Sequence, residues 1–310
     1  MFAAFNVFLT AALQRLQKAI FGYGYNGSSS TYLSVTNLVS NTGVVATDTT
    51  GVGTSRFLLA AAGYGGDKAL FGFGYNASSG TYYSITNLVS NTGVVATDTT
   101  GVGTARSSSA AAGYGGDKAL FGFGYNAGTY YSITNLVSNT GVVASNTTGV
   151  GTARDGLAAA GYGGDKALFG FGFNASGSTY YSVTNLVSNT GVVASNTTGV
   201  GTARSNLAAA GYGKDKALFF GGLFSTTYYN VKNLVSNTGV VATDTATSAT
   251  ARAYLAAAGY GWDKAILGFG NNGGGDTSIT NLVSNTGVVA SNTTGVGTVR
   301  YGLAAASYGT

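Results

Sequence analysis

The chain contains no cysteine, no proline, no histidine and no glutamate. Without cysteine no disulfide framework can form, and cysteine usage indicates no redox compartment. The absence of histidine removes the commonest general base and the commonest metal ligand. The aspartates are scattered along the chain, so no catalytic constellation is visible. The sequence therefore predicts a protein that is not an enzyme and that uses no cofactor and no metal.

Charged side chains are also scarce, at 8% of the 310 residues. Fifteen Lys or Arg residues outnumber ten Asp residues, which gives a net charge of +5, and they are spread over the whole chain. Nucleic-acid-binding proteins more often gather their basic residues on one stripe. We therefore expect a mildly basic surface and no nucleic-acid partner.

Glycine and tyrosine are abundant, and they belong to a sequence that repeats itself. The ten residues Asn-Leu-Val-Ser-Asn-Thr-Gly-Val-Val-Ala occur six times, at spacings of 50, 48, 50, 48 and 48 residues, beginning at Asn37, Asn87, Asn135, Asn185, Asn233 and Asn281. Self-similarity at this period is typical of propellers and solenoids. In each copy, strand-forming residues flank a Ser-Asn-Thr-Gly turn whose glycine tolerates the left-handed conformation. Each motif is therefore expected to be the bend of a β-hairpin.

The second repeat shows the expected strands most clearly. Small residues over 59–64 predict a strand, and the glycines that follow predict a tight turn. Aromatic residues alternate over 68–75, which predicts a second strand. Residues 82–90 and 94–97 are expected to form the third and fourth strands.

The repeated unit of four antiparallel strands predicts the fold class. We expect an all-β protein, in the form of a six-bladed β-propeller of four-stranded blades over residues 18–310. A β-solenoid is the second possibility, although solenoids normally use shorter turns and fewer strands. The alanine-rich strand suits the crowded centre of a propeller. Glycines in the second strand leave hollows for aromatic side chains of the adjacent blade.

The two ends of the repeated region predict how the propeller closes. The second-strand motif starts at Lys18, and the last small-residue strand covers residues 303–308. The C-terminal strand is therefore expected to lie beside residues 18–25 and to remove the open sheet edges.

Residues 1–17 lie outside the repeats and form a separate segment. Apolar residues recur in it at helical spacing, which predicts a short amphipathic helix with Phe2, Phe5, Phe8, Leu9, Leu13 and Leu16 on one face. The alternative is a degenerate first strand, because residues 9–12 align without gaps with residues 59–62. The apolar run is shorter than the roughly twenty residues that a membrane span needs. We interpret the six apolar side chains as an anchor to a larger protein assembly.

The repeats resemble those of kelch-type β-propellers. The matching features are a small-residue inner strand, a hydrophobic strand that ends in glycines, as in the double glycine of residues 216–222, and an arginine ahead of the inner strand at Arg56, Arg106, Arg154, Arg204, Arg252 and Arg300. Regulator-of-chromosome-condensation repeats are a second resemblance. The near-identical tandem copies, rich in Gly, Ser, Thr, Asn and Tyr, are also similar to repeat proteins of bacteriophage virions.

Most motifs that could suggest a ligand site have a structural interpretation. Gly72-Phe73-Gly74 lies inside a strand and opens no helix, unlike a phosphate-binding loop. Asp67 and Lys68 are expected to be turn residues. Asp48 and Asp98 could bind calcium, but the equivalent residues of other repeats are asparagines, and calcium needs an oxygen-rich cage.

Tyrosine and asparagine at the loops are adaptable contact residues, so they are the candidates for recognition. These candidates are Tyr25, Asn26, Tyr75, Asn76, Tyr125 and Asn126, together with Trp262 in a turn.

Two functional hypotheses from different classes follow. The first is a non-enzymatic structural or adhesion component of a phage virion, in its tail or on its capsid surface. The propeller would be exposed for recognition of the host or of a partner, and the N-terminus would bind other virion proteins. The alternative is a lectin-like propeller that binds cell-surface glycans through its loop tyrosines and asparagines.

Overall fold

The computed structural model describes residues 17–309, and this part of the chain is built almost entirely from β-strands. The prediction of an all-β protein is confirmed. Between residues 17 and 309 the only helical segment is the 3-10 turn η1 (Ala175–Gly177). The helix predicted over residues 1–17, with its six apolar anchor residues, lies outside the described residues except for Gln17. None of the described helical segments is long and apolar enough to cross a membrane.

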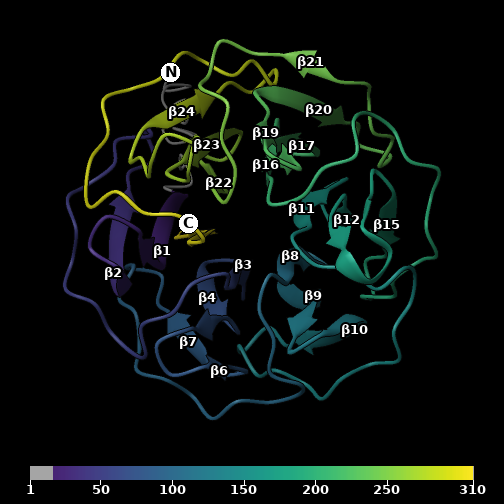
Figure 1. The fold of residues 1–310 in the computed structure, drawn as a ribbon, viewed down its shortest axis with the longest axis horizontal. Helices are drawn as coiled ribbons and strands as arrows, with labels where there is room; N and C mark the ends of the chain where they lie inside the picture. Colours follow the sequence, from purple (N-terminus) through teal and green to yellow (C-terminus); the bar gives the residue numbers. More distant parts are fainter. Residues whose placement is uncertain (1–16, 310) are drawn as a thin grey trace, which may run out of the picture.

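The described residues form six main sheets arranged around a central axis (Figure 1). The innermost strand of each is β3 (Ala60–Tyr64), β8 (Ala110–Tyr114), β11 (Ala158–Tyr162), β16 (Ala208–Tyr212), β22 (Ala256–Tyr260) or β25 (Ala304–Tyr308). The second strands start at the repeated lysine: β1 (Lys18–Asn26), β4 (Lys68–Gly72), β9 (Lys118–Asn126), β12 (Lys166–Gly170), β17 (Lys216–Phe220) and β23 (Lys264–Gly268). The third strands are β2 (Thr31–Val39), β7 (Thr86–Val89), β10 (Thr129–Val137), β15 (Thr184–Val187), β20 (Val231–Val235) and β24 (Thr280–Val283).

Three short hairpins extend the sheets at one end. They pair β5 (Tyr75–Asn76) with β6 (Thr81–Tyr82), β13 (Phe173–Asn174) with β14 (Thr179–Tyr180), and β18 (Leu223–Phe224) with β19 (Thr227–Tyr228). In the first and third repeats the long strands cover the same region, β1 paired with β2 and β9 with β10, and each pairing has a register shift, between Gly22 and Gly24 and between Tyr131 and Thr134.

The predicted fourth strand is wrong for most repeats. Only β21 (Thr245–Ala246) pairs as a fourth strand among the described residues, so the sheets are small and open. In the second repeat the predicted strand 94–97 makes one isolated bridge, between Val95 and Val89. The physical reason is that Asn87 donates its side-chain amide to the Ala96 carbonyl (3.0 Å), and a side chain thereby takes the place of a ladder hydrogen bond.

The innermost strands contact one another in the order β25, β3, β8, β11, β16 and β22, and β22 contacts β25 again. β25 also pairs with β1, from Lys18 opposite Tyr308 to Gly22 opposite Ala304. The predicted pairing of the C-terminal strand with the first repeat is therefore present. It joins segments from opposite ends of the chain in one sheet.

Glycines of the second strands receive aromatic rings from the next sheet, as the sequence predicted. A Cβ added at Gly72 would lie 2.7 Å from the Phe121 ring, and one at Gly122 would lie 2.6 Å from Phe169. Both rings are fully buried. The core of the molecule therefore lies between neighbouring sheets, around the axis.

Candidate functional site: the two faces around the axis

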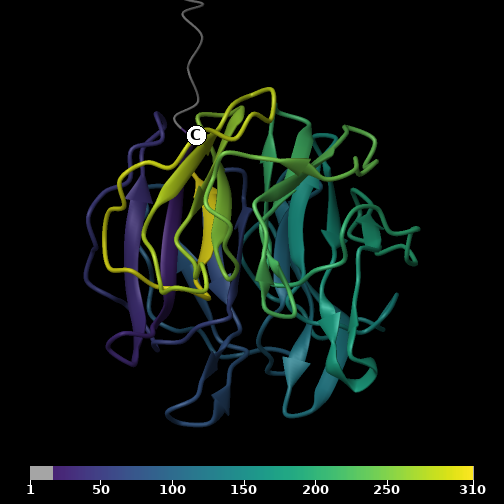
Figure 2. The same cartoon turned by 45° about the horizontal axis from the view of Figure 1, so that its top comes forward.

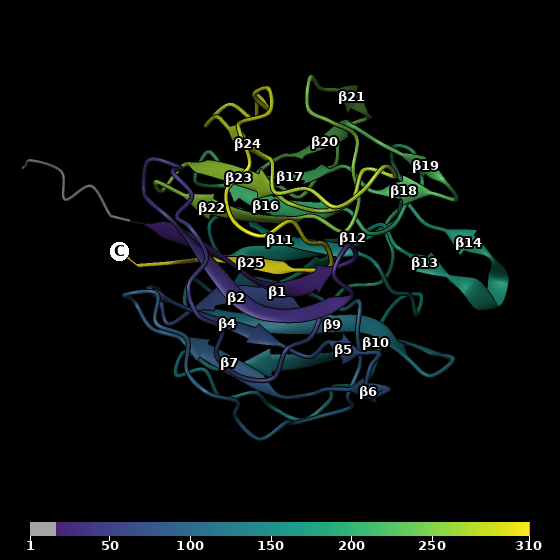
Figure 3. The same ribbon diagram turned by 60° about the vertical axis from the view of Figure 1, so that its left-hand side comes forward.

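The sheets present two opposite faces around the axis. The turn face carries the turns between innermost and second strands, together with Gln17 and the end of β25. The loop face carries the three short hairpins, which project away from the C-terminal end in Figure 3. Figure 2 shows the long strands running from one face to the other. The two ends of the axis are therefore built from different parts of the repeats.

A buried arginine joins neighbouring sheets in every repeat. Arg106 is fully buried and donates to the Phe123 carbonyl (2.6 Å) and to Asn135 Oδ1 (2.7 Å). Its guanidinium lies 4.2 Å from the centre of the Phe73 ring in the preceding sheet, a favourable cation–π contact. Burial lowers the pKa of Arg106 to about 10, so it remains charged at neutral pH. In the sixth and first sheets, Arg252 and Arg300 keep the bond to the repeated asparagine, but their Nε atoms have no hydrogen-bond partner among the described residues. Because all six arginines are fully buried and bonded within the protein, they belong to the scaffold.

The two calcium candidates hold the linkers between repeats. Asp98 accepts hydrogen bonds from the Thr54 backbone (3.0 Å) and from Asn87 (2.8 Å). Burial alone would raise the pKa of Asp98, but the hydrogen bonds from Thr54 and Asn87 outweigh it and lower the pKa. Asp48 occupies the same position against Asn37. In the third repeat Asn146 takes this place, and residues 17–309 contain no cluster of three or more carboxylates that could hold a metal ion.

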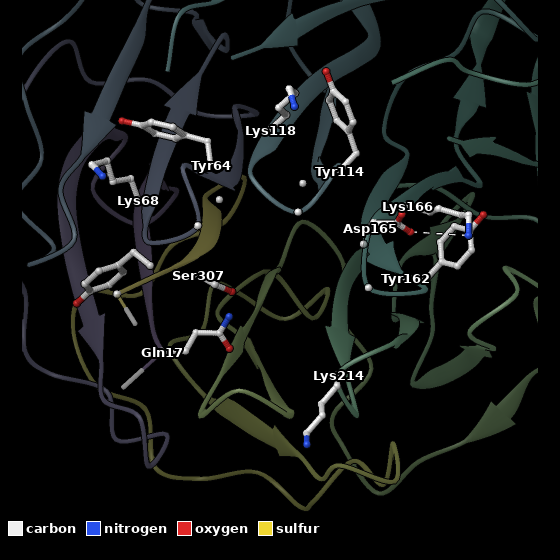
Figure 4. A pocket seen from close by; sticks show the side chains of 18 residues that line it. Gln17, Tyr64, Lys68, Tyr114, Lys118, Tyr162, Asp165, Lys166, Lys214 and Ser307 are labelled. Atoms are coloured by element: carbon white, nitrogen blue, oxygen red, sulfur yellow. Dashed lines mark ion pairs between the residues drawn. The ribbon is translucent and has the colours of Figure 1, made fainter. Parts of the chain in front are cut away.

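At the turn face the axis opens into a cavity of about 240 Å³ (Figure 4). Tyrosines and lysines from successive repeats line it, including Tyr64, Lys68, Lys118, Lys166 and Lys214. The lysines that begin β4, β9, β12, β17 and β23 each pair with the preceding aspartate at 2.7–3.7 Å. The positive charge of this wall is thus largely balanced, and the Asp-Lys pairs have the predicted turn positions.

Backbone hydrogen bonds connect the turns of this face. Gly65 donates to the Asp117 carbonyl at 2.7 Å, and the same bond recurs between later repeats. Between the sixth and first sheets Gly261 donates to the Gln17 carbonyl (2.8 Å), and between the first and second sheets Gly309 donates to the Asp67 carbonyl (2.7 Å). Gln17 therefore takes the position that an aspartate has in the other repeats.

At the loop end, a ring of backbone hydrogen bonds constricts the axis. Six residues with positive φ each donate to the carbonyl of another member at 2.6–3.0 Å: Leu58, Ser108, Gly156, Asn206, Tyr254 and Gly302. The space beside this ring is only about 70 Å³. The two ends of the axis therefore differ, and the wider opening is on the turn face.

The predicted recognition tyrosines lie on the loop face, where they also close the hairpins. Tyr75 is half-buried, with its ring centre 4.4 Å from that of Tyr82 on the paired strand. The first and third repeats repeat this contact, with Tyr25 against Tyr32 and Tyr125 against Tyr130. These tyrosine pairs are thus partly exposed on the loop face.

The predicted recognition asparagines hold loops and linkers in place. Asn76 donates to the Ser55 carbonyl (3.0 Å), and Asn126 donates to the Ala105 carbonyl (2.7 Å). Asn26 accepts from the Ser29 backbone (3.1 Å). These amides position the loop face.

Trp262 lies on the turn face, apart from the other six candidates. The residue is 43% exposed, and its backbone N–H donates to the Gln17 side chain (3.1 Å). With Tyr260 and Leu282 it lines a separate cavity of about 1050 Å³.

Sequence reasoning missed a cavity of about 480 Å³ on the loop face, which is lined by Tyr228, Tyr254, Tyr301, Asn271 and Asp276. The sequence feature that could have pointed to this cavity is that residues 271–276 depart from the repeat.

No family model matches this chain, and no curated protein matches it either.

Proposed function

We propose that this chain is a kelch-like six-bladed β-propeller that acts as a non-enzymatic recognition module on a phage virion. The sheets would be its blades. The cyclic contacts of the innermost strands and the pairing of β25 with β1 support this assignment. The virion assignment is supported by the resemblance of the tandem repeats to phage proteins.

The distribution of sequence differences among the six repeats carries the recognition role. The Asn-Leu-Val-Ser-Asn-Thr-Gly motif is the same in all six copies, and its first asparagine binds the buried arginine. In contrast, the loop-face segments differ in length and composition, from Asn-Ala-Gly-Thr at 126–129 to residues 271–277 of the sixth repeat. A constant scaffold with variable loops is the arrangement that recognition modules use.

The two faces are suited to separate tasks. Gln17, the first described residue, lies on the turn face, on the side opposite the variable loops. We propose that Phe2, Phe5, Phe8, Leu9, Leu13 and Leu16 attach the module to other virion proteins, while the loop face binds the host or a partner. Burial of one such large apolar side chain is worth about 1.5–3 kcal/mol.

Deletion of residues 1–16 tests the attachment. Gln17 is retained because it accepts the hydrogen bond from Gly261. The variant is expected to fold with an unchanged melting temperature and to be missing from purified particles. A matched variant that shortens the loop at 77–80 to the length of the third repeat should enter particles normally and lose target binding. Normal incorporation of the deletion variant would overturn the attachment proposal.

A lectin-like role is the second candidate, because half-buried tyrosines gather on the loop face. A glycan array probed with the purified chain tests it. Binding that the shortened 77–80 loop abolishes would favour this role, and a uniformly blank array would exclude it.

A further inference from the structure

The loop-face cavity lies where the sixth repeat departs from the others. In the second repeat Tyr75 pairs with Tyr82, and the two rings pack together. In the sixth repeat Asn271 and Asp276 form the corresponding bridge, and Asn271 donates to Asp276 Oδ1 (2.8 Å). Two short polar side chains thus replace two large rings. The loop-face cavity of about 480 Å³ lies beside this polar pair.

Tyrosines from three parts of the chain line this cavity. Tyr228 comes from the fifth repeat and donates its hydroxyl to Asn271 Oδ1 (3.2 Å). Tyr254 and Tyr301 come from the linkers before β22 and β25, and their ring centres are 5.5 Å apart at an angle of 64°. Burial raises the pKa of Tyr254 to about 12, so its ring is a neutral phenol at physiological pH. Such rings offer electron-rich faces to a ligand.

The carboxylate of Asp276 is the charged group of the cavity. Eight of the ten aspartates form ion pairs with Lys or Arg in the described part of the chain. Asp276 is not among them, and its Oδ2 accepts only the backbone N–H of Gly27 (2.7 Å) beside its bond from Asn271. No lysine or arginine lines the cavity. The negative charge is therefore uncompensated next to three aromatic rings.

We propose that this cavity binds an organic cation, specifically a methylated or quaternary ammonium group, between Tyr228, Tyr254, Tyr301 and Asp276. Aromatic faces attract such cations, and the methyl groups are apolar enough to leave water for an aromatic lining. A bare metal ion would find too few oxygen ligands, because a single carboxylate lines the space. The inference deepens the proposed function, since it names a chemical group that the loop face would recognise.

Titration of the full chain with choline, followed by calorimetry, tests the proposal. Choline is expected to bind at least tenfold more tightly than 3,3-dimethylbutan-1-ol, which has the same shape without the charge. The difference should shrink at high salt. Equal binding of the two compounds, or binding of neutral sugars without binding of choline, would overturn the proposal.

Variants locate the site. Tyr301→Leu and Asp276→Asn should each weaken choline binding at least tenfold, whereas Tyr125→Leu, in the same face of the third repeat, should leave it unchanged. Asp276→Asn can disturb the Gly27 contact, so a second variant is needed. The double change Asn271→Tyr and Asp276→Tyr restores the pair of the second repeat; it should fold normally and lose binding. Retained binding in that double variant would overturn the proposal, whereas the particle experiments above would be unaffected.

Discussion

At the scale of single residues, the buried arginines and their asparagine partners decide stability. Each arginine is fully buried, and a charged donor in that position is costly to leave without hydrogen-bond partners. The repeated Asn supplies an acceptor to the arginine and a donor to a carbonyl at the same time, as Asn135 does for Arg106 and Ala144. A single amide therefore satisfies two buried groups.

Asn135→Ala is expected to lower the free energy of unfolding by about 2–4 kcal/mol, because it leaves a buried charged donor without its acceptor. Chemical denaturation measures this change. Asn139→Ala is the control in the same repeat: that side chain is exposed, and its loss should cost no more than about 0.5 kcal/mol. Equal effects of the two substitutions would contradict the role assigned to the hydrogen bonds between the buried arginines and their asparagines.

Asp155 makes the stability of the protein depend on pH. Burial raises the pKa of Asp155 to about 7, above the value of an unfolded chain. The folded state therefore holds this proton more tightly, and stability falls as pH rises from about 4 through 7. Asp155→Asn should raise the melting temperature at pH 8 and leave it nearly unchanged at pH 4. A scan that shows the same gain at both pH values would refute this assignment.

At the scale of strands, the fifth and sixth sheets carry two departures from the repeat that compensate each other: a large side chain is added in one strand, and a smaller one faces it in the other. Four of the other second strands read Gly-Phe-Gly and the first reads Gly-Tyr-Gly, but the fifth reads Phe220-Gly221-Gly222. The sixth repeat has Leu267 where its neighbours have the buried phenylalanine, and Phe220 and Leu267 share one core cluster. The Phe220 ring also lies 5.6 Å from the Arg252 guanidinium. The smaller side chain of Leu267 thus makes room for the Phe220 ring.

Leu267→Phe alone is expected to overpack this interface and to cost about 1–3 kcal/mol. Combining it with Phe220→Gly and Gly221→Phe restores the sequence of the other repeats and should recover most of the loss. Thermal unfolding of the single and triple variants measures the coupling. Additive losses in the triple variant would show that the two strands do not compensate each other.

At the scale of the whole molecule, the C-terminal strand holds the first and last repeats together. β25 pairs with β1 and contacts β3 and β22, so it joins three sheets. Its contacts connect residues almost the full chain length apart. Folding of the whole molecule should therefore be complete only when the last strand is in place.

Deletion of residues 302–310 should abolish cooperative unfolding and cause aggregation, because β1 would expose a strand edge while β3 and β22 would lose a packing neighbour. Size-exclusion chromatography and calorimetry measure both effects. A truncated chain that remains monomeric with the melting temperature of the full chain would contradict this role of β25.

The sequence alone determined the all-β class, the innermost and second strands and the fit of glycines to aromatic rings. It could do so because these features depend on local spacing that recurs six times. It overestimated the fourth strand, because the competition of the Asn87 side chain for the Ala96 carbonyl is not visible in a hydrophobic pattern.

Only the tertiary structure decided which candidate recognition residues lie together. It placed Trp262 on the face opposite the loop tyrosines, since the turn between β22 and β23 lies at the other end of the strands. It also brought Tyr228, Asp276 and Tyr301 around one cavity. These residues are far apart in the chain and belong to no common motif. Their proximity depends on how the last repeats pack against the first, which is a property of the whole tertiary structure rather than of any one repeat.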